Sequence, residues 1–162
     1  MEDLIQSKEE FFDYIPKNKK EYQNMIQCVL YHADFVCFTV LPFLDNIGEF
    51  NNSIWSRMRY SVADYGFARA ASDSRNDKSH LILFKKDYFV YQFLKEKSNI
   101  FDFQEEDSVS GIMLEDPAFI RKGEVFCYTI THEKMCIMTE DIYRQITAAK
   151  QGKRKKTSRK AD

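Results

Sequence analysis

The sequence predicts an α+β fold, in which an antiparallel sheet of about five or six strands is packed with N-terminal helices and a C-terminal helix. Three observations support this class. Residues 19–32 have helical periodicity, residues 79–94 hold two apolar runs around a short charged break, and turn signals recur through 111–139. Most of the strands are therefore expected within residues 80–139.

Two helices are predicted near the N-terminus. Ser7 and Glu10 have the spacing of a capping box, so a short helix is expected over 7–15, before Pro16. The helix expected over 19–32 has the stronger pattern, because its apolar residues recur at i, i+3, i+4 and i+7. These apolar residues are Tyr22, Met25, Ile26, Val29 and Leu30.

Residues 35–41 form an apolar segment that is either a buried strand or the end of a buried helix. Its β-branched and aromatic residues favour a strand. Ser53 is expected to cap a further helix over 54–63. The stretch 65–71 stays ambiguous, since Gly66 weakens a continuous helix.

Residues 79–94 are the predicted centre of the sheet. The runs 81–84 and 88–94 are rich in β-branched and aromatic residues, and 85–87 between them are charged. A short charged break between two such runs is typical of a β-hairpin. Both faces of the second run are apolar, so both faces of the sheet are expected to need cover.

Further strands and a last helix are predicted towards the C-terminus. A short strand at 111–114 is expected to end in a turn at 115–117. Residues 122–123 suit a hairpin turn, because Gly123 supplies a positive φ. A third hairpin is expected over 124–139. The closing helix is predicted to run to about residue 150, with Ile142 and Ile146 on its buried side.

The formal net charge of −1 is unevenly distributed along the chain. Residues 150–162 hold seven Lys or Arg and one acidic residue, so this part carries +6 and residues 1–149 carry −7. We expect one α+β domain over 1–149 and a basic disordered tail over 150–162. The tail is either solvated or makes weak, non-specific contacts with nucleic acid. The basic residues expected to make them are Lys153, Arg154, Lys155, Lys156, Arg159 and Lys160.

The sequence predicts a cytoplasmic protein without membrane contact. It begins without a basic segment and apolar core of the kind found in signal peptides, and no apolar run approaches the ~20 residues that a membrane span needs. The four cysteines are accordingly expected to be reduced thiols.

The cysteines could either bind zinc or have a structural role. Cys28 and His32 share one face of the expected helix, and His132 and Cys136 flank a turn, so two pairs could provide four ligands. However, the sequence has no C-x2-C pair, and three of the cysteines lie in apolar runs, where Cys behaves as a small hydrophobic residue. We therefore predict no metal site and no cofactor.

An enzymatic alternative depends on His80 and His132. Both lie at predicted strand ends, and with Lys78 or Arg75 they could provide the base, the acid and the cation of a metal-independent ribonuclease. The spacing does not single out this arrangement, and the phosphate-binding, nucleophile-elbow and zinc-protease motifs are missing. Catalytic residues are therefore predicted only under this alternative, a nucleic-acid-associated factor.

The function expected from the sequence is a non-enzymatic protein-interaction domain. Its size, acidic body and lack of a catalytic motif resemble those of small immunity or inhibitor proteins, although no shared motif supports the likeness. An acidic face is expected to attract a basic partner protein. The residues expected to bind this partner are Glu105, Glu106, Asp107, Glu115 and Asp116.

Aromatic residues offer a second source of binding anchors. Most of the 14 Phe and nine Tyr residues are expected in the core. Any that are exposed could act as anchors for a partner. The candidates are Tyr14, Tyr31, Tyr60, Tyr65 and Tyr88.

Overall fold

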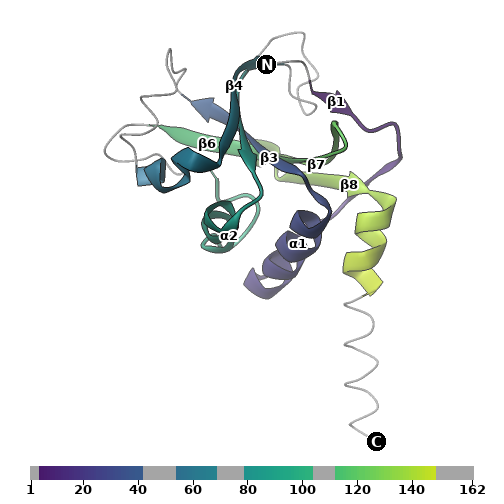
Figure 1. Cartoon of the computed structure of the whole chain (residues 1–162). Helices are drawn as coiled ribbons and strands as arrows, with labels where there is room; N and C mark the ends of the chain where they lie inside the picture. The colour runs from purple at the N-terminus through teal and green to yellow at the C-terminus, as the bar shows by residue number, and fades with distance from the viewer. Residues whose placement is uncertain (1–3, 42–53, 69–78, 104–111, 149–162) are drawn as a thin grey trace, which may run out of the picture.

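The structure, a computed structural model, describes residues 4–41, 54–68, 79–103 and 112–148. In this part of the chain, helices pack along one side of a curved sheet (Figure 1). The helices are α1 (Lys19–His32), α2 (Tyr88–Lys95) and a last helix over 140–148, with 3-10 turns η2 (Ile54–Ser61) and η3 (Thr131–Glu133). The predicted α+β class is confirmed.

The described residues form eight strands, more than the five or six predicted. Their order in the sheet is β2-β8-β7-β6-β3-β5-β4, and all these pairs are antiparallel. The short β1 pairs with β7 in parallel. The strands are β1 (Ile5–Gln6), β2 (Phe11–Asp13), β3 (Phe35–Leu41), β4 (Val62–Ala68), β5 (Ser79–Lys85), β6 (Met113–Arg121), β7 (Glu124–Ile130) and β8 (Met135–Thr139).

Helix α1 has the predicted bounds, and all five residues of its apolar stripe are buried. Its first turn is capped by the Asn18 side chain, which accepts a hydrogen bond from the Glu21 N–H at 2.9 Å. The Tyr22 hydroxyl donates to the backbone carbonyl of Leu94, so α1 is joined to α2 through the core. Strand β3 also has the bounds of the predicted apolar segment, which settles its open assignment in favour of a strand.

The helix predicted over 7–15 is wrong, because this segment forms β1 and β2 instead. The residues of β2 pair with β8, Phe11 opposite Thr139 and Phe12 opposite Met138. The Ser7 hydroxyl accepts from the Glu9 N–H at 3.3 Å, which makes a local turn rather than a helix cap. Pairing with the edge of the sheet thus prevails over the capping-box pattern.

The hairpin predicted at 79–94 is half right. Its first run is strand β5, but its second run is helix α2. Asp87 caps this helix by accepting from the Val90 N–H at 3.1 Å. The buried side chains of Val90, Phe93 and Leu94 have i, i+3, i+4 spacing, so the helical period prevails over the strand preference of an aromatic-rich run. The centre of the sheet is instead β3, which lies between β5 and β6.

Residues 54–63 are helical only in part. The 3-10 helix η2 ends at Ser61, and the ambiguous stretch that follows belongs to strand β4. Met58 of η2 is fully buried in the main core, which lies between the sheet and its helices. The opposite face of the sheet has a smaller apolar cluster that includes Cys37, Leu81 and Tyr128.

The C-terminal hairpins are largely as predicted. The turn at 122–123 is confirmed, with φ of +49° at Lys122 and +78° at Gly123, the signs of a type I′ turn. The predicted turn at 115–117 is wrong, because β6 continues through these residues and instead contains a bulge, with φ of +52° at Asp116. The last helix begins after Thr139 and buries Ile142 and Ile146, as predicted.

Candidate functional sites

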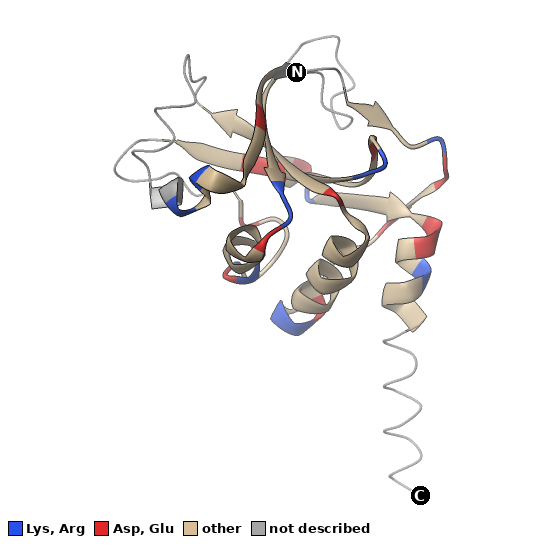
Figure 2. Cartoon of the chain, viewed as in Figure 1, with Lys and Arg blue, Asp and Glu red and all other residues tan. Residues whose placement is uncertain are grey.

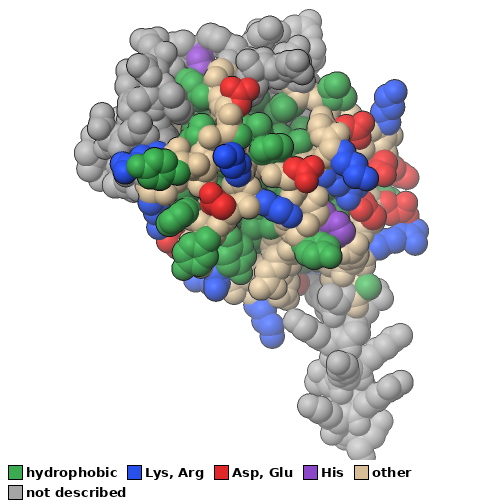
Figure 3. All heavy atoms as spheres, viewed as in Figure 1, with side chains coloured by type: hydrophobic (Ala, Val, Ile, Leu, Met, Phe, Trp, Pro, Cys, Tyr) green, Lys and Arg blue, Asp and Glu red, His purple; other side chains and the backbone are tan. Residues whose placement is uncertain are grey.

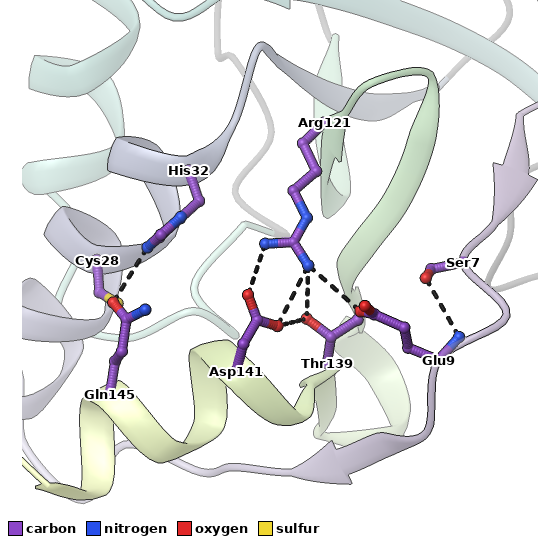
Figure 4. A network of polar contacts seen from close by, with 8 residues as sticks. All are labelled: Ser7, Glu9, Cys28, His32, Arg121, Thr139, Asp141 and Gln145. Atoms are coloured by element: carbon purple, nitrogen blue, oxygen red, sulfur yellow. Dashed lines mark hydrogen bonds and ion pairs between the residues drawn. The ribbon is translucent and has the colours of Figure 1, made fainter.

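A polar cleft of about 430 Å³ lies where the end of α1, the β6–β7 turn, the N-terminal segment and the last helix meet. Figure 4 shows the side chains that lie on these elements. Members of the cleft lining are Glu9, His32, Asp34, Arg121, Phe126 and Asp141.

Arg121 is the centre of the polar contacts in this cleft. Its guanidinium donates to Asp141 at 2.7 and 3.2 Å and to Glu9 at 3.3 Å, and it lies 4.7 Å from the ring centroid of Phe126. These hydrogen bonds raise the pKa of Arg121 and lower the pKa of Asp141 to about 2. Two carboxylates already compensate the charge of the guanidinium, so Arg121 is poorly suited to binding a phosphate. Its hydrogen bonds instead join β6 to the last helix and to the N-terminal segment.

Cys28 and His32 do lie on one face of α1, as predicted, and both reach Gln145 of the last helix. The Gln145 side-chain oxygen lies 3.0 Å from His32 Nε2 and 3.6 Å from Cys28 Sγ. Burial, and to a smaller extent Asp141, raises the pKa of the Cys28 thiol. A cysteine nucleophile needs its thiolate form, so this arrangement does not provide an activated Cys–His pair.

The four residues weighed as zinc ligands do not form one site. His132 lies at the β7–β8 turn with its side chain 59% exposed, 3.8 Å from Glu133. Cys136 points the other way, into the core, where it hydrogen-bonds with Cys127 and thereby raises the pKa of the Cys127 thiol. Within the described residues, no group of three or more His, Cys, Asp or Glu side chains is placed to hold a metal ion.

The two histidines of the ribonuclease alternative belong to separate parts of the sheet. His80 is buried in β5, with its ring 5.5 Å from that of Tyr65. Strands β3 and β6 lie between β5 and β7, so His80 and the turn that holds His132 are three strand spacings apart, roughly 14 Å along the sheet. This separation does not suit an acid–base pair on one phosphate. Lys78 and Arg75 lie outside the described residues.

Of the five residues expected to form the acidic face, the structure describes only Glu115 and Asp116. Asp116 is engaged within the fold, because its carboxylate accepts from the Thr131 N–H at 2.7 Å. Glu115 is half-buried, and burial is the main cause that raises its pKa. Glu105, Glu106 and Asp107 lie outside the described residues, as does the basic tail, so their binding roles stay predictions.

An aromatic surface, formed by Tyr31, Tyr60, Tyr88 and Phe89, is the most prominent exposed feature. These side chains are 80%, 79%, 68% and 49% exposed, respectively. Three of the five tyrosines considered as anchors are thus exposed, and Phe89, which belongs to a run predicted as a strand, adds a fourth exposed ring. Figure 3 shows hydrophobic side chains at the surface next to Lys, Arg, Asp and Glu.

Hydrogen bonds hold the three elements of the aromatic surface together. Lys86, just before α2, donates to the backbone carbonyls of Leu30 at 3.0 Å and Tyr31 at 3.1 Å at the end of α1. The Ser61 hydroxyl at the end of η2 donates to the Asp87 carboxylate. The rings of Tyr88 and Phe89 make an edge contact at 5.8 Å. The end of α1, the end of η2 and the start of α2, which carry these side chains, are therefore joined to one another.

Two cations lie beside exposed rings of the aromatic surface. The Arg59 guanidinium lies 4.7 Å from the ring centroid of Tyr60 and donates to the Tyr60 hydroxyl at 3.0 Å. Lys86, just before α2, is also exposed and bonds to the backbone of Tyr31. Among the described residues, no carboxylate forms an ion pair with either cation. Figure 2 shows basic and acidic residues interspersed along the ribbon, and Asp87, the residue after Lys86, places one carboxylate at the start of α2.

Comparisons of the chain with protein-family models, curated proteins and solved structures found no match. Among the described helices, none is long and apolar enough to cross a membrane.

Proposed function

We propose that this chain is a non-enzymatic protein-binding domain of the inhibitor type, which docks on its partner through the aromatic surface. The observation that carries the proposal is the exposure of Tyr31, Tyr60 and Tyr88, each 68% or more, where three elements meet. Tyrosine is enriched among the residues that contribute most binding energy at interfaces, because its large ring loses little conformational entropy when it is buried.

The aromatic surface is not required by the core. The side chains that stabilise the same elements point inwards: Met58 from η2 and Val90 from α2 are both fully buried. The exposed rings therefore leave apolar area in water that the fold does not use, and a partner that covers this area would gain binding energy.

Docking on a preformed surface costs little reorganisation. Lys86 joins the start of α2 to the end of α1, and Asp87 joins it to η2. Because these contacts are already present in the free chain, the elements that carry the tyrosines are fixed relative to one another, which favours tight binding.

Site-specific photo-cross-linking tests this proposal. A photoreactive phenylalanine analogue is placed at Tyr60 or Tyr88, with a matched control at Glu133, which is also exposed but lies at the β7–β8 turn. The same partner protein is expected to cross-link at positions 60 and 88 and not at 133. With that partner purified, Tyr60→Ala and Tyr88→Ala are each expected to weaken binding by about tenfold. Unchanged affinity in both variants would refute the docking role.

A further inference from the structure

Given the proposed protein-binding function, we infer that the partner presents an acidic segment, with apolar side chains among its carboxylates, to the aromatic surface. This inference concerns Arg59, which stacks on the ring of Tyr60, and Lys86, whose ammonium donates to the backbone carbonyl of Tyr31. It reverses the charge of the partner expected from the acidic body of the sequence.

Arg59 differs from the other arginines that the structure describes. Arg57 pairs with Glu96 at 2.7 Å, Arg121 pairs with Asp141 at 2.7 Å, and Arg144 pairs with Glu140. Arg59 has no carboxylate partner in the described residues, and its only described hydrogen bond is to the Tyr60 hydroxyl. Three of the four described guanidinium groups are thus compensated within the chain, and the fourth lies beside an exposed ring.

The guanidinium of Arg59 is arranged to receive a carboxylate. Its stacking on Tyr60 at 4.7 Å restricts the side chain, so less conformational entropy is lost when it binds. One hydrogen bond to Tyr60 leaves most of the five guanidinium N–H donors free, and a paired set of such donors matches the two oxygens of a carboxylate.

Lys86 adds a fixed positive charge near Tyr31. Its ammonium donates to two backbone carbonyls at the end of α1, Leu30 at 3.0 Å and Tyr31 at 3.1 Å, which leaves its third N–H for a partner. Arg59 belongs to η2 and Lys86 bonds to the end of α1, so the two cations lie on the two elements that contact the start of α2.

The sign of this surface contrasts with the rest of the chain. Residues 1–149 carry a formal charge of −7, so two cations without an ion-pair partner among the described residues are an exception that average composition does not explain. The same sign excludes the basic 150–162 segment as the occupant, because like charges repel. An acidic partner segment complements both the charge and the apolar rings.

Single-stranded nucleic acid is the competing occupant, since its phosphates are anionic and its bases stack on aromatic rings. An acidic protein segment is favoured because nucleic acid would also meet the repulsion of the acidic body, against only two cations at this surface. Nucleic acid is therefore an outcome that the experiment has to detect.

The first test is the chemistry of the cross-linked segment. Mass spectrometry of the adducts formed at positions 60 and 88 identifies the partner peptide. We expect a peptide with more Asp and Glu than Lys and Arg, and with apolar residues between the acids. A neutral or basic peptide, or an RNA adduct, would overturn the inference.

The second test uses that purified partner and the variant Arg59→Glu. Its affinity is expected to fall by about tenfold at low salt, and its salt dependence is expected to be weaker than that of the unmodified chain. Lys20→Glu is the matched control, an exposed charge reversal on the first turn of α1, and it should leave binding unchanged.

The two proposals fail in different ways. If Arg59→Glu binds normally while Tyr60→Ala still weakens binding, the aromatic surface docks a partner but the inference about acidic chemistry is wrong. If neither variant affects binding, the proposed docking function itself is wrong. Circular dichroism of each variant checks that α1 and α2 remain folded, so that a loss of affinity reports on the surface.

Discussion

Asp116 and Thr131 exchange two hydrogen bonds between the bulge of β6 and the end of β7. The Asp116 N–H donates to the Thr131 hydroxyl at 3.2 Å, and the Thr131 N–H donates to the Asp116 carboxylate at 2.7 Å. Asp116 has a φ of +52°, in the left-handed region that Asp tolerates better than most residues. The pair therefore fixes the bulge to the start of the η3 turn.

Asp116→Ala is expected to lower the free energy of unfolding by about 1–3 kcal/mol, because the Thr131 N–H loses its acceptor and alanine is strained at positive φ. Asp116→Asn is the control, since its amide oxygen can still accept and Asn tolerates this conformation. Urea denaturation measures both variants. Equal losses for Ala and Asn would contradict the explanation.

Gly123→Ala should destabilise the protein by about 1 kcal/mol through backbone strain alone. Gly123 has a φ of +78°, and a Cβ built there would have no heavy atom within 4 Å, so no clash contributes. Lys122→Asn in the same turn should be neutral or slightly stabilising, because Asn suits the φ of +49° found there. Thermal unfolding checks both changes, and a neutral Gly123→Ala would refute the strain argument.

Asp141 should contribute stability that disappears in acid. Its pKa is lowered to about 2, mainly by the hydrogen bond from Arg121, so its folded pKa lies below its unfolded value. Its contribution is therefore present above the unfolded pKa of about 4 and is lost as the pH falls towards 2. The site is open to solvent, which limits the effect to about 1 kcal/mol or less.

The measurement is the urea midpoint of the unmodified chain and of Asp141→Asn across this pH range. The difference between them should narrow from pH 5 to pH 2. Glu140→Gln is the control, because Glu140 pairs with Arg144 on the exposed side of the same helix. A difference that stays constant with pH would show that the Arg121 hydrogen bonds do not set the titration of Asp141.

Cys28 should react slowly with iodoacetamide at neutral pH, and its rate should rise steadily with pH above 8. Burial raises the pKa of this thiol, so little thiolate is present near neutrality. Cys37 should be slower still, since full burial raises its pKa to about 12. His32→Ala should leave the Cys28 rate nearly unchanged. Fast alkylation at neutral pH that His32→Ala abolishes would instead indicate an activated Cys–His pair.

Strong local patterns were sufficient to predict some of the fold. The bounds of α1 follow from a repeated apolar stripe, and the 122–123 turn follows from one glycine. The helix predicted over 7–15 is wrong because the conformation of this segment is decided by pairing with β8, more than 120 residues further along the chain. The strand predicted over 88–94 is wrong because the helical spacing of Val90, Phe93 and Leu94 outweighs the strand preference of the aromatic residues.

The candidate sites were less predictable, because they depend on contacts between distant segments. The i, i+4 spacing placed Cys28 and His32 on one face, but only the fold brings in Gln145. Exposure of Tyr31, Tyr60 and Tyr88 was anticipated as a possibility. The three elements that carry these tyrosines are joined by hydrogen bonds of Lys86 and Asp87, and no local sequence pattern reveals these bonds.

The sheet order has a consequence for synthesis on the ribosome. Strands β1 and β2 pair with β7 and β8, and the central β3 needs β5 and β6 on its two sides. A nascent chain that has emerged only as far as α2 thus contains strands whose neighbours have not yet left the ribosome. Its apolar surfaces need protection from aggregation until residues up to 139 leave the exit tunnel.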